Sequence, residues 1–324
     1  MYDGVPPLNG FFPDGGDAVA TKINQRFKKT SRMDEMKKIS AFLVLLAMVA
    51  YAAPVRFLGI DESRGQLIYV NTKNAAENWA LKLPEKCRDY QMLSPTRLLL
   101  NGRRGYYEMD LPTKTIVKTV ARDEFGGTMS CRRTKDGKTL LAALREGGTV
   151  IFELDANDNV LRKAVFPGRN SLRLMRESGV GTMYFGGPED TLTEVDMTGK
   201  VIRETKIPGG RHVYQGERLP NGNLLVSSGY GGSIVEFDTD GKEIRRLHVK
   251  DDEKARGIVS GFFAGMEILK DGSIVVSNWT GHGANDSEKG QQLLMFAPDG
   301  RIVWTWHDAK LAGTLHGVII LENE

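Results

Sequence analysis

Cysteine and long apolar runs are both scarce in this chain of 324 residues, and each scarcity excludes a class of protein. The two cysteines, Cys87 and Cys131, form neither a Cys-x-x-Cys pair nor the Cys/His spacing of a zinc site. They lie about one repeat of the chain apart, so two interpretations stay open: separate buried thiols, or a disulfide between neighbouring repeats. After residue 54 no ten-residue segment has a convincing 3.6-residue apolar period, which argues against a mainly helical fold.

The chain also lacks any block of like charge. Its net charge is +3 and its pI is about 8.7, with acidic and basic residues well mixed. A nucleic-acid-binding protein normally shows clustered Lys and Arg, so we expect no nucleic-acid partner. The sequence has no Gly-x-Ser-x-Gly motif, no P-loop and no convincing dinucleotide fingerprint. Several common enzyme classes are therefore not indicated.

The only strongly apolar segment lies near the N-terminus, at residues 36–53. Lys37 and Lys38 precede a short apolar core at 39–49, and residues 50–52 read Ala-Tyr-Ala. This order of positive, apolar and small residues is typical of a secretory signal peptide. The apolar core is short for a membrane span, although an uncleaved anchor remains the alternative. We therefore expect export to the periplasm or the extracellular space, with membrane association only if the segment stays uncleaved.

The chain upstream of this segment fits the prediction poorly, because a signal peptide should begin near the first Met. Residues 1–35 are rich in Pro and Gly and have no periodicity. We interpret them as a misassigned start or a disordered extension, with translation beginning at Met33 or Met36. The remaining residues, 54–324, are expected to form one domain.

Within that domain, residues 211–249 are the clearest copy of a repeated unit. The unit has four short strand-like runs, and its turns include Pro-Asn-Gly at 220–222 and Asp-Gly at 240–241. Asn-Gly and Asp-Gly supply the positive φ values that tight hairpins need. Four antiparallel strands at this repeat length predict one blade of a β-propeller.

Counting the units gives the predicted architecture. Five complete units follow one another along the chain, and the N-terminal unit lacks its first strand. The last apolar run, HGVIILE at 316–322, matches that missing strand. We therefore predict an all-β, six-bladed propeller that closes when the C-terminal strand joins the N-terminal blade, leaving no open edge. The stretch 251–261 is expected to contain one short helical turn.

The repeat also resembles known families. The segments EVDMTGKVIRE, EFDTDGKEIRR and FAPDGRIVWTW resemble the PQQ-like repeat and the blades of SMP-30/NHL and arylsulfotransferase-type propellers. The resemblance covers roughly residues 54–322. PQQ-dependent dehydrogenases have eight blades and a calcium-binding constellation that this sequence lacks, so the repeat does not imply PQQ as a cofactor. The resemblance to arylsulfotransferase-type propellers implies a channel histidine with basic neighbours, a role that His212 or His316 could fill beside Arg211 and Arg173.

One face of the predicted propeller gathers the candidate site residues. Links between blades, and links between the second and third strands of a blade, open on the same face, where propeller ligands usually bind. These links carry three of the five histidines and many arginines. Imidazole serves as acid, base or metal ligand near neutral pH, and guanidinium groups favour anions. The candidate catalytic residues are His212 and His316, and the candidate ligand-binding residues are Arg88, Arg145, Arg173, Arg211, Tyr214 and His282.

Each candidate also has a purely structural interpretation, since a His or Arg at a blade entry often bonds a neighbouring carbonyl. A metal at His282, Asn285 and Asp286 is not favoured, because the spacing matches no known cage. Two functions remain open. The first is an exported binding or scaffold protein for a small anionic molecule, a glycan or a protein. The alternative is a hydrolase or transferase, of arylsulfotransferase or lactonase type, that uses the histidines at the channel mouth.

Overall fold

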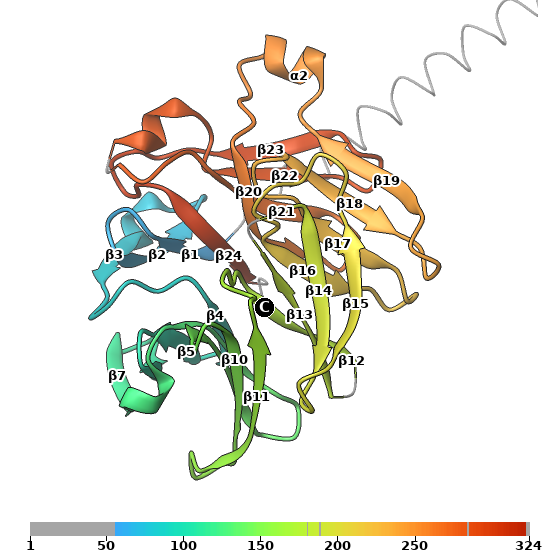
Figure 1. Ribbon diagram of the computed structural model, residues 1–324. Coiled ribbons are helices and arrows are strands. Elements are labelled where there is room, and N and C mark those ends of the chain that lie inside the picture. The colour runs from blue at the N-terminus through green and yellow to red at the C-terminus, as the bar shows by residue number, and fades with distance from the viewer. Residues whose placement is uncertain (1–55, 180, 188, 284, 322–324) are drawn as a thin grey trace, which may run out of the picture. The chain divides into compact units, whose positions relative to one another are not determined.

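The computed structural model describes residues 56–321 except residues 180, 188 and 284. This part of the chain forms six four-stranded antiparallel sheets. The sheets follow one another in a ring, so the fold is a six-bladed β-propeller, as the repeats predict (Figure 1). The predicted signal peptide and the segment 1–35 lie outside the described residues. Among the described residues, none of the helices reaches the length and hydrophobicity of a membrane-spanning segment.

The first three blades contain the N-terminal half of the propeller, and their strands are given in order across each sheet. Blade 1 comprises β24 (Leu315–Leu321), β1 (Arg56–Asp61), β2 (Gln66–Asn71) and β3 (Trp79–Lys82). Blade 2 comprises β4 (Tyr90–Ser94), β5 (Arg97–Gly102), β6 (Gly105–Asp110) and β7 (Thr115–Ala121). Blade 3 comprises β8 (Thr128–Arg133), β9 (Thr139–Arg145), β10 (Gly148–Leu154) and β11 (Val160–Pro167).

The other three blades repeat this meander. Blade 4 comprises β12 (Met175–Gly179), β13 (Thr182–Gly186), β14 (Thr191–Asp196) and β15 (Val201–Lys206). Blade 5 comprises β16 (Gln215–Arg218), β17 (Leu224–Ser227), β18 (Ser233–Phe237) and β19 (Glu243–His248). Blade 6 comprises β20 (Phe262–Ile268), β21 (Ile274–Trp279), β22 (Leu293–Phe296) and β23 (Ile302–Trp306).

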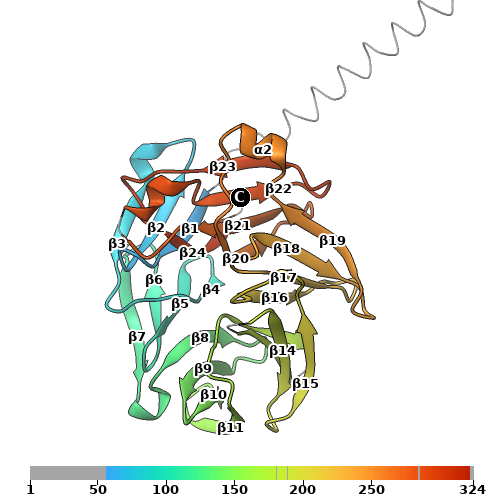
Figure 2. The same ribbon diagram turned by 45° about the horizontal axis from the view of Figure 1, so that its top comes forward.

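Short helices occur only in links between the described strands. They are η1 (Ala75–Glu77), η2 (Asp123–Phe125), η3 (Asp286–Lys289) and α2 (Asp251–Ala255). The expected helical turn in 251–261 is thus confirmed as α2, which begins the link between blades 5 and 6. Figure 2 shows the ring with the first strands of the blades turned toward its middle.

The predicted closure of the ring is also confirmed. β24 pairs antiparallel with β1, with Arg56 opposite Leu321 and Gly59 opposite Val318. A side-chain contact reinforces the end of this pairing, because the Asp61 carboxylate accepts the Gly313 N–H at 2.7 Å. Strands from the two ends of the described chain therefore complete one sheet, and this joins the C-terminal strand to the N-terminal blade and closes the ring.

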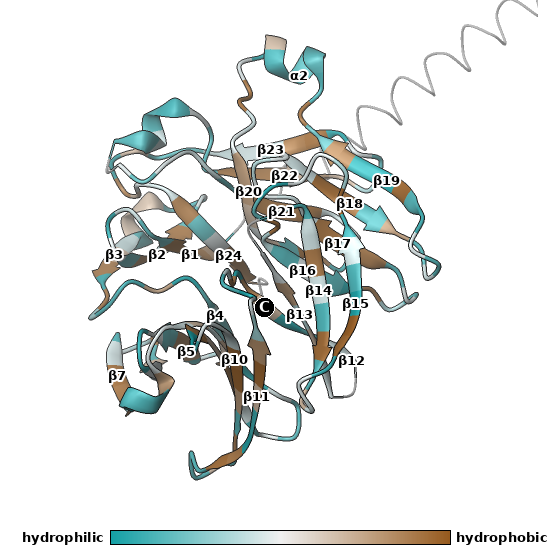
Figure 3. Cartoon of the chain, in the orientation of Figure 1, coloured by the Kyte–Doolittle hydropathy of each residue, from teal (hydrophilic) through white to brown (hydrophobic). Residues whose placement is uncertain are grey.

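Apolar side chains are concentrated between the blades. Six hydrophobic clusters each join residues of two neighbouring blades, one cluster for each of the six interfaces of the ring. Figure 3 shows hydrophobic colour on many of the strands and hydrophilic colour on much of α2 and the turns. Because each blade packs on both of its neighbours, both faces of its strands are apolar, and strict alternation is lost in runs such as Leu98–Leu99–Leu100.

The two cysteines belong to different interfaces. Cys87 packs between blades 1 and 2, and Cys131 packs between blades 2 and 3. Both are buried and free, so the interpretation as separate thiols is confirmed. Burial raises the pKa of both thiols above the ordinary range, which makes them poor nucleophiles.

The hairpin turns depend on glycine where the sequence predicts it. Gly272, in the turn between β20 and β21, has φ +82°, and the nearest heavy atom to the place that a Cβ would take is Pro298 Cγ, at 3.6 Å. The cost of a side chain there is therefore conformational rather than steric. Gly272→Ala is expected to lower the free energy of unfolding by about 1 kcal/mol, measured by chemical denaturation. Gly187→Ala is the control, because Gly187 lies outside the positive-φ region and has room for a methyl group; an equal loss in both variants would contradict this explanation.

Candidate functional site

A small cavity opens on the face that carries the links between blades, and we call it the rim pocket. Its volume is about 180 Å³. The lining residues come from five of the six blades or from the links that lead into them. They are Arg88, Arg173, His212, Tyr214, Tyr230, Phe262, Trp279, His282 and His316.

Six of the eight residues proposed from the sequence line this pocket. They are Arg88, Arg173, His212, Tyr214, His282 and His316. The other two lie elsewhere. Arg211 stacks over the ring of Tyr230, with its guanidinium carbon 4.7 Å from the ring centroid, and so supports the pocket from outside. Arg145 donates to the main-chain carbonyl of Asp123 at 3.1 Å and pairs with Glu146 at 3.2 Å, so its side chain holds a loop.

Aromatic rings form one wall of the rim pocket. Tyr214, Phe262 and Trp279 belong to a seventh hydrophobic cluster, which lies at the channel mouth rather than between two blades. Edge-to-face contacts connect the wall, with ring centroids 5.5 Å apart for Tyr214 and Phe262 and 5.6 Å for Phe262 and Trp279. His316 lies against this wall, 5.4 Å from Trp279. The rings thereby fix one another in position.

Three buried polar atoms of the pocket lack a hydrogen-bond partner among the described residues. They are the Tyr214 hydroxyl, Trp279 Nε1 and His316 Nδ1. Leaving a buried polar group unpaired costs about 1–3 kcal/mol. Burial raises the pKa of Tyr214, so its hydroxyl stays protonated and can donate. Tyr214 and Trp279 are thus two residues of the pocket lining whose donor groups the described protein leaves unpaired.

Arg173 adds a positive charge that no carboxylate of the described residues neutralises within ion-pair distance. One guanidinium nitrogen lies 2.8 Å from His212 Nδ1, and another donates weakly to the Leu172 carbonyl at 3.4 Å. Burial lowers the pKa of His212, and the charge of Arg173 lowers it further, so His212 is held neutral and accepts from Arg173. His212 also has φ +57°, an uncommon left-handed conformation for a residue with a side chain. Together these residues form a basic corner of the pocket.

Glu62 supplies a negative charge beside three residues of the pocket lining, and sequence reasoning missed it. Its carboxylate is almost fully buried, 3.4 Å from the Arg88 guanidinium and 3.2 Å from His282 Nδ1. Burial raises the pKa of Glu62, but the basic side chains around it, the Arg88 guanidinium among them, outweigh that effect and lower it overall. Glu62 lies in the β1–β2 link, a link of the type that carries the other candidates. Glu62 is hard to recognise as a site residue from the sequence, because the first strand of its blade comes from the C-terminal end of the chain.

His316, in the closing strand β24, lies next to Glu62. Its Nε2 is 3.9 Å from the Glu62 carboxylate, which is too far for a hydrogen bond. Burial lowers its pKa to about 3, and the attraction of Glu62 only partly offsets that shift. The imidazole is therefore neutral at pH 7. It can donate or accept through its unpaired Nδ1, according to the tautomer.

Because His316 is neutral in the folded protein, we predict that this residue lowers the free energy of unfolding in acid. Its pKa in the folded protein, about 3, lies below the ordinary value of 6.5, so between these values the unfolded chain binds a proton that the folded chain does not. The free energy of unfolding then falls as the pH drops below 6.5. His316→Phe should make this free energy less dependent on pH, measured by urea denaturation at several pH values. His248→Gln, at an exposed histidine, is the control, and identical pH slopes in wild type and His316→Phe would contradict the assignment.

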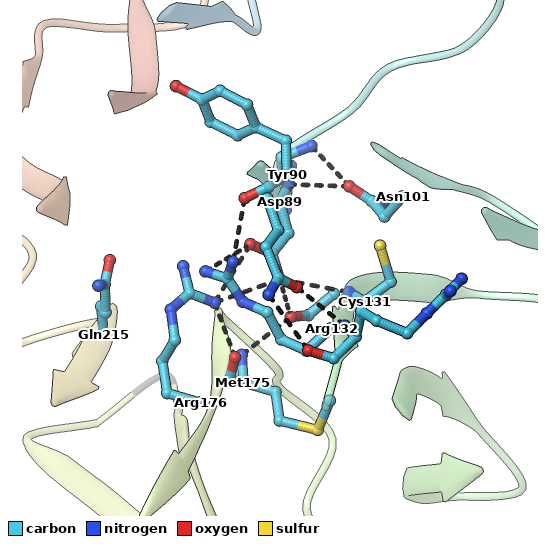
Figure 4. A network of polar contacts seen from close by, with 12 residues as sticks. Asp89, Tyr90, Asn101, Cys131, Arg132, Met175, Arg176 and Gln215 are labelled. Atoms are coloured by element: carbon cyan, nitrogen blue, oxygen red, sulfur yellow. Dashed lines mark hydrogen bonds and ion pairs between the residues drawn. The ribbon is translucent and has the colours of Figure 1, made fainter. Parts of the chain in front are cut away.

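A second, larger cavity of about 460 Å³ occupies the channel, and Arg88 lines both cavities. Asp89 is the centre of its polar network. Its carboxylate lies 3.3 Å from the Arg132 guanidinium and 3.1 Å from that of Arg176, and it also accepts the Ser130 hydroxyl. Figure 4 shows both arginines directed at Asp89. The network therefore joins blades 2, 3 and 4 around one buried carboxylate.

The carboxyl group of Glu267 also lines the channel cavity. Burial raises its pKa to about 7, and Arg132 offsets part of that shift. We assign no ligand to the channel on this basis.

The described residues contain no group of three or more His, Cys, Asp or Glu side chains arranged to hold a metal ion. The triad considered from the sequence involves Asp286, whose carboxylate pairs with Lys289 at 2.7 Å and accepts the Gly283 N–H at 3.0 Å. Those contacts hold the loop between β21 and β22.

Comparison with known proteins shows the fold and little more. No family model and no curated protein matches the chain. A solved structure of a protein of unknown function from Bacteroides caccae is 20% identical, with 84% of this chain and 100% of that chain covered and a TM-score of 0.68. A streptogramin B lyase is 13% identical, with 82% and 86% covered and a TM-score of 0.55. The virginiamycin B lyase of Staphylococcus aureus is 10% identical, with 78% and 84% covered and a TM-score of 0.53.

At such low identities these likenesses concern the propeller fold, which supports many unrelated functions. The resemblance of the repeats to the PQQ-like, SMP-30/NHL and arylsulfotransferase-type families stays a prediction. The function has to be argued from the rim pocket itself.

Proposed function

We propose that the chain is an exported binding propeller that recognises a small ligand through an oxyanion, such as a carboxylate, in the rim pocket. The observation that carries this proposal is that three residues lining one pocket have donors left unused. Arg173 has no ion-pair partner among the described residues, and the Tyr214 hydroxyl and Trp279 Nε1 are buried without partners. An anion with two or three oxygens would satisfy all of these groups at once.

The balance of charge in the pocket favours this interpretation. Arg88 is paired with Glu62, which leaves Arg173 as the charge available to a ligand. His212 and His316 are neutral near pH 7 and can add hydrogen bonds without adding charge. The aromatic wall excludes water from one side, which strengthens the hydrogen bonds that an anion would accept.

A binding survey tests the proposal directly. Purified protein would be titrated by calorimetry with acetate, benzoate, phenyl phosphate, phenyl sulfate and D-galacturonate, and with the neutral analogues benzamide and D-galactose. We expect at least one anion to bind while its neutral analogue does not, and Tyr214→Phe to weaken that binding by removing one donor. The proposal would be contradicted if no anion binds better than its neutral analogue, or if Tyr214→Phe leaves the affinity for the anion unchanged.

Export is the second part of the proposal and is supported by the signal-peptide pattern at residues 36–53. Sequencing the N-terminus of the mature protein tests it. We expect the mature chain to begin shortly after Ala52, and a mature terminus upstream of residue 50 would argue against cleavage there.

A second candidate function, a hydrolase or transferase, is favoured by one contact. Glu62 accepts from His282 Nδ1 at 3.2 Å, which orients the exposed imidazole and leaves its Nε2 available as an acid or base. One solved neighbour is a catalytically inactive His-to-Ala variant of virginiamycin B lyase with quinupristin, so a histidine matters for activity in that propeller. The likeness itself concerns only the fold.

Turnover measurements separate this candidate from simple binding. Aryl sulfates, lactones and phosphate esters would be incubated with wild type and with His282→Asn, His212→Ala and His316→Ala. An enzyme of this kind should show turnover that His282→Asn reduces by about 10²–10⁴-fold. Ligand binding without turnover of any of these substrates would support the binding function and argue against the enzymatic function.

A further inference from the structure

A groove adjoins the rim pocket and extends it along the surface; we call it the side groove. Its volume is about 330 Å³, and its lining residues are Tyr230, Val259, Ser260, Gly261, Phe262, Trp279, Thr280 and Lys289. Three of them, Tyr230, Phe262 and Trp279, also line the rim pocket. The two spaces therefore share one aromatic wall.

The sizes of the two spaces indicate that a ligand uses both. Small-molecule sites usually measure about 300–1,000 Å³. The rim pocket, at about 180 Å³, falls below that range and accommodates little more than an acidic end group. The side groove brings the combined site into the usual range.

The side groove also exposes large apolar side chains that do not belong to the outermost strands of the blades. Tyr230 is 47% exposed and Val259 is 43% exposed. The other large hydrophobic side chains exposed among the described residues all belong to outermost strands of their blades. They are Val117, Val160, Leu161, Ile202 and Ile244. Apolar exposure away from the outer edges is thus confined to this groove, which is typical of a binding surface.

Tyr230 is held rigidly although it is half exposed. The Arg211 guanidinium lies 4.7 Å from its ring centroid, and the rings of Phe262 and His212 meet it edge to face at 4.8 Å and 5.6 Å. A ring that is already ordered loses little entropy when a ligand packs on it. Tyr230 therefore presents a fixed flat surface beside the basic corner of the rim pocket.

The main chain of the groove favours a sugar over a peptide. The N–H of Val259 donates to Gln291 Oε1 at 3.1 Å, and the N–H of Gly261 donates to Asn278 Oδ1 at 2.6 Å. The Val259 carbonyl accepts from Asn278 Nδ2 at 2.8 Å. These groups are not free to pair with an extended peptide. A sugar ring needs no such edge, because its C–H face packs on aromatic and aliphatic side chains.

Charge favours a ligand that is acidic along its length. Arg173 supplies the positive charge of the rim pocket. Lys289 lines the side groove, and 62% of its side chain is exposed. Lys289 already pairs with Asp286, so its attraction for a second carboxylate is modest. The groove nevertheless contains no acidic residue among its lining side chains.

We infer that the ligand is an acidic oligosaccharide, with a terminal uronic acid in the rim pocket and the next sugar over Tyr230 and Val259 in the side groove. This inference rests on the proposed oxyanion-binding function and specifies its ligand. The carboxylate of the terminal sugar meets Arg173, Tyr214 and Trp279. The second ring adds apolar contact in the groove.

Calorimetric titration with matched monomers and dimers tests the inference. The probes are D-galacturonate, D-glucuronate and D-mannuronate, a uronic-acid disaccharide of each, neutral cellobiose, 4-biphenylcarboxylate and the dipeptide Gly-Phe. We expect at least one acidic disaccharide to bind about tenfold more tightly than its monomer, a gain of roughly 1.4 kcal/mol. Cellobiose should bind weakly, because it brings no oxyanion to the rim pocket.

A groove variant separates this inference from the function on which it rests. Val259→Asn places a polar but uncharged side chain in the side groove, outside the rim pocket lining, and should abolish the advantage of the disaccharide while leaving the monomer unchanged. Val117→Asn, on the outer strand β7 and 49% exposed, is the matched control.

The outcomes are distinct. Monomers that bind in an Arg173-dependent way, with no disaccharide binding more tightly, overturn the oligosaccharide and leave the oxyanion site. The biphenyl acid or the dipeptide outperforming every disaccharide also overturns it. Failure of every anion to bind, or binding insensitive to Arg173→Met, overturns the proposed function itself.

Discussion

Arg173→Met is expected to weaken the binding of an oxyanion ligand by about tenfold to a hundredfold, because a hydrogen bond to a charged group contributes about 1.5–3 kcal/mol. Methionine keeps most of the apolar volume and removes the charge and the donors. No carboxylate of the described residues depends on Arg173 for neutralisation, so the variant should fold normally. Isothermal calorimetry gives the affinity, and a thermal melt shows whether the fold is intact.

Two further variants make this result specific. Arg173→Lys should bind with intermediate affinity, because the charge stays while the planar pair of donors is lost. Arg103→Met removes an exposed arginine from the same face of the propeller, outside the rim pocket, and should leave affinity unchanged. Equal losses in Arg173→Met and Arg103→Met would mean that the general positive field, rather than a built site, attracts the ligand.

Asp89→Asn is expected to cost about 3–5 kcal/mol of folding free energy, the largest effect on stability that we predict. The substitution keeps the shape of the side chain and removes the charge that neutralises Arg132 and Arg176. Arg176 keeps a contact with Glu217 at 3.1 Å, whereas Arg132 loses the only carboxylate within ion-pair distance of it among the described residues. A buried guanidinium without a counter-ion is costly.

The measurement is urea denaturation, with a decrease of the melting temperature of about 6–15 °C as a second readout. Asp123→Asn is the control, because the Arg104–Asp123 pair is largely exposed and should contribute less than about 1 kcal/mol. A loss below about 1 kcal/mol in Asp89→Asn as well would show that the channel network contributes little to stability.

The propeller could be predicted because its signals are local and repeated. Turns such as Asp240–Gly241 require positive φ, and Gly241 has φ +88°. The strand in the last apolar run could be assigned to the first blade only because that blade lacked a strand, and closure of a sheet has a definite physical benefit.

The site could be predicted only in part. The repeat indicates which links share a face, and this was enough to collect Arg88, Arg173, Tyr214 and three histidines. It does not indicate the direction of a side chain within a link, so Arg145 was grouped with them although its guanidinium bonds a neighbouring loop. Spacing also does not reveal that Trp279 Nε1 is buried and unpaired, because that depends on the rings packed around it.

Glu62 shows a second limit. The Glu62 carboxylate belongs to the site because three blades bring Arg88, His282 and His316 around it, and these residues are distant from it in the sequence. A charge between two strands has the pattern of an ordinary turn residue until its neighbours in space are known. The role of Glu62 therefore becomes visible only when its burial and its neighbours in the folded protein are known.

A crystal structure of the protein with D-galacturonate tests the central claim most directly, since it locates the oxyanion. The crystals would be grown without other carboxylates, sulfate or phosphate. We predict that the carboxylate oxygens lie within hydrogen-bond distance of the Arg173 guanidinium, the Tyr214 hydroxyl and Trp279 Nε1. A ligand bound in the channel around Asp89, or on the outer strands with the rim pocket left unused, would contradict the account.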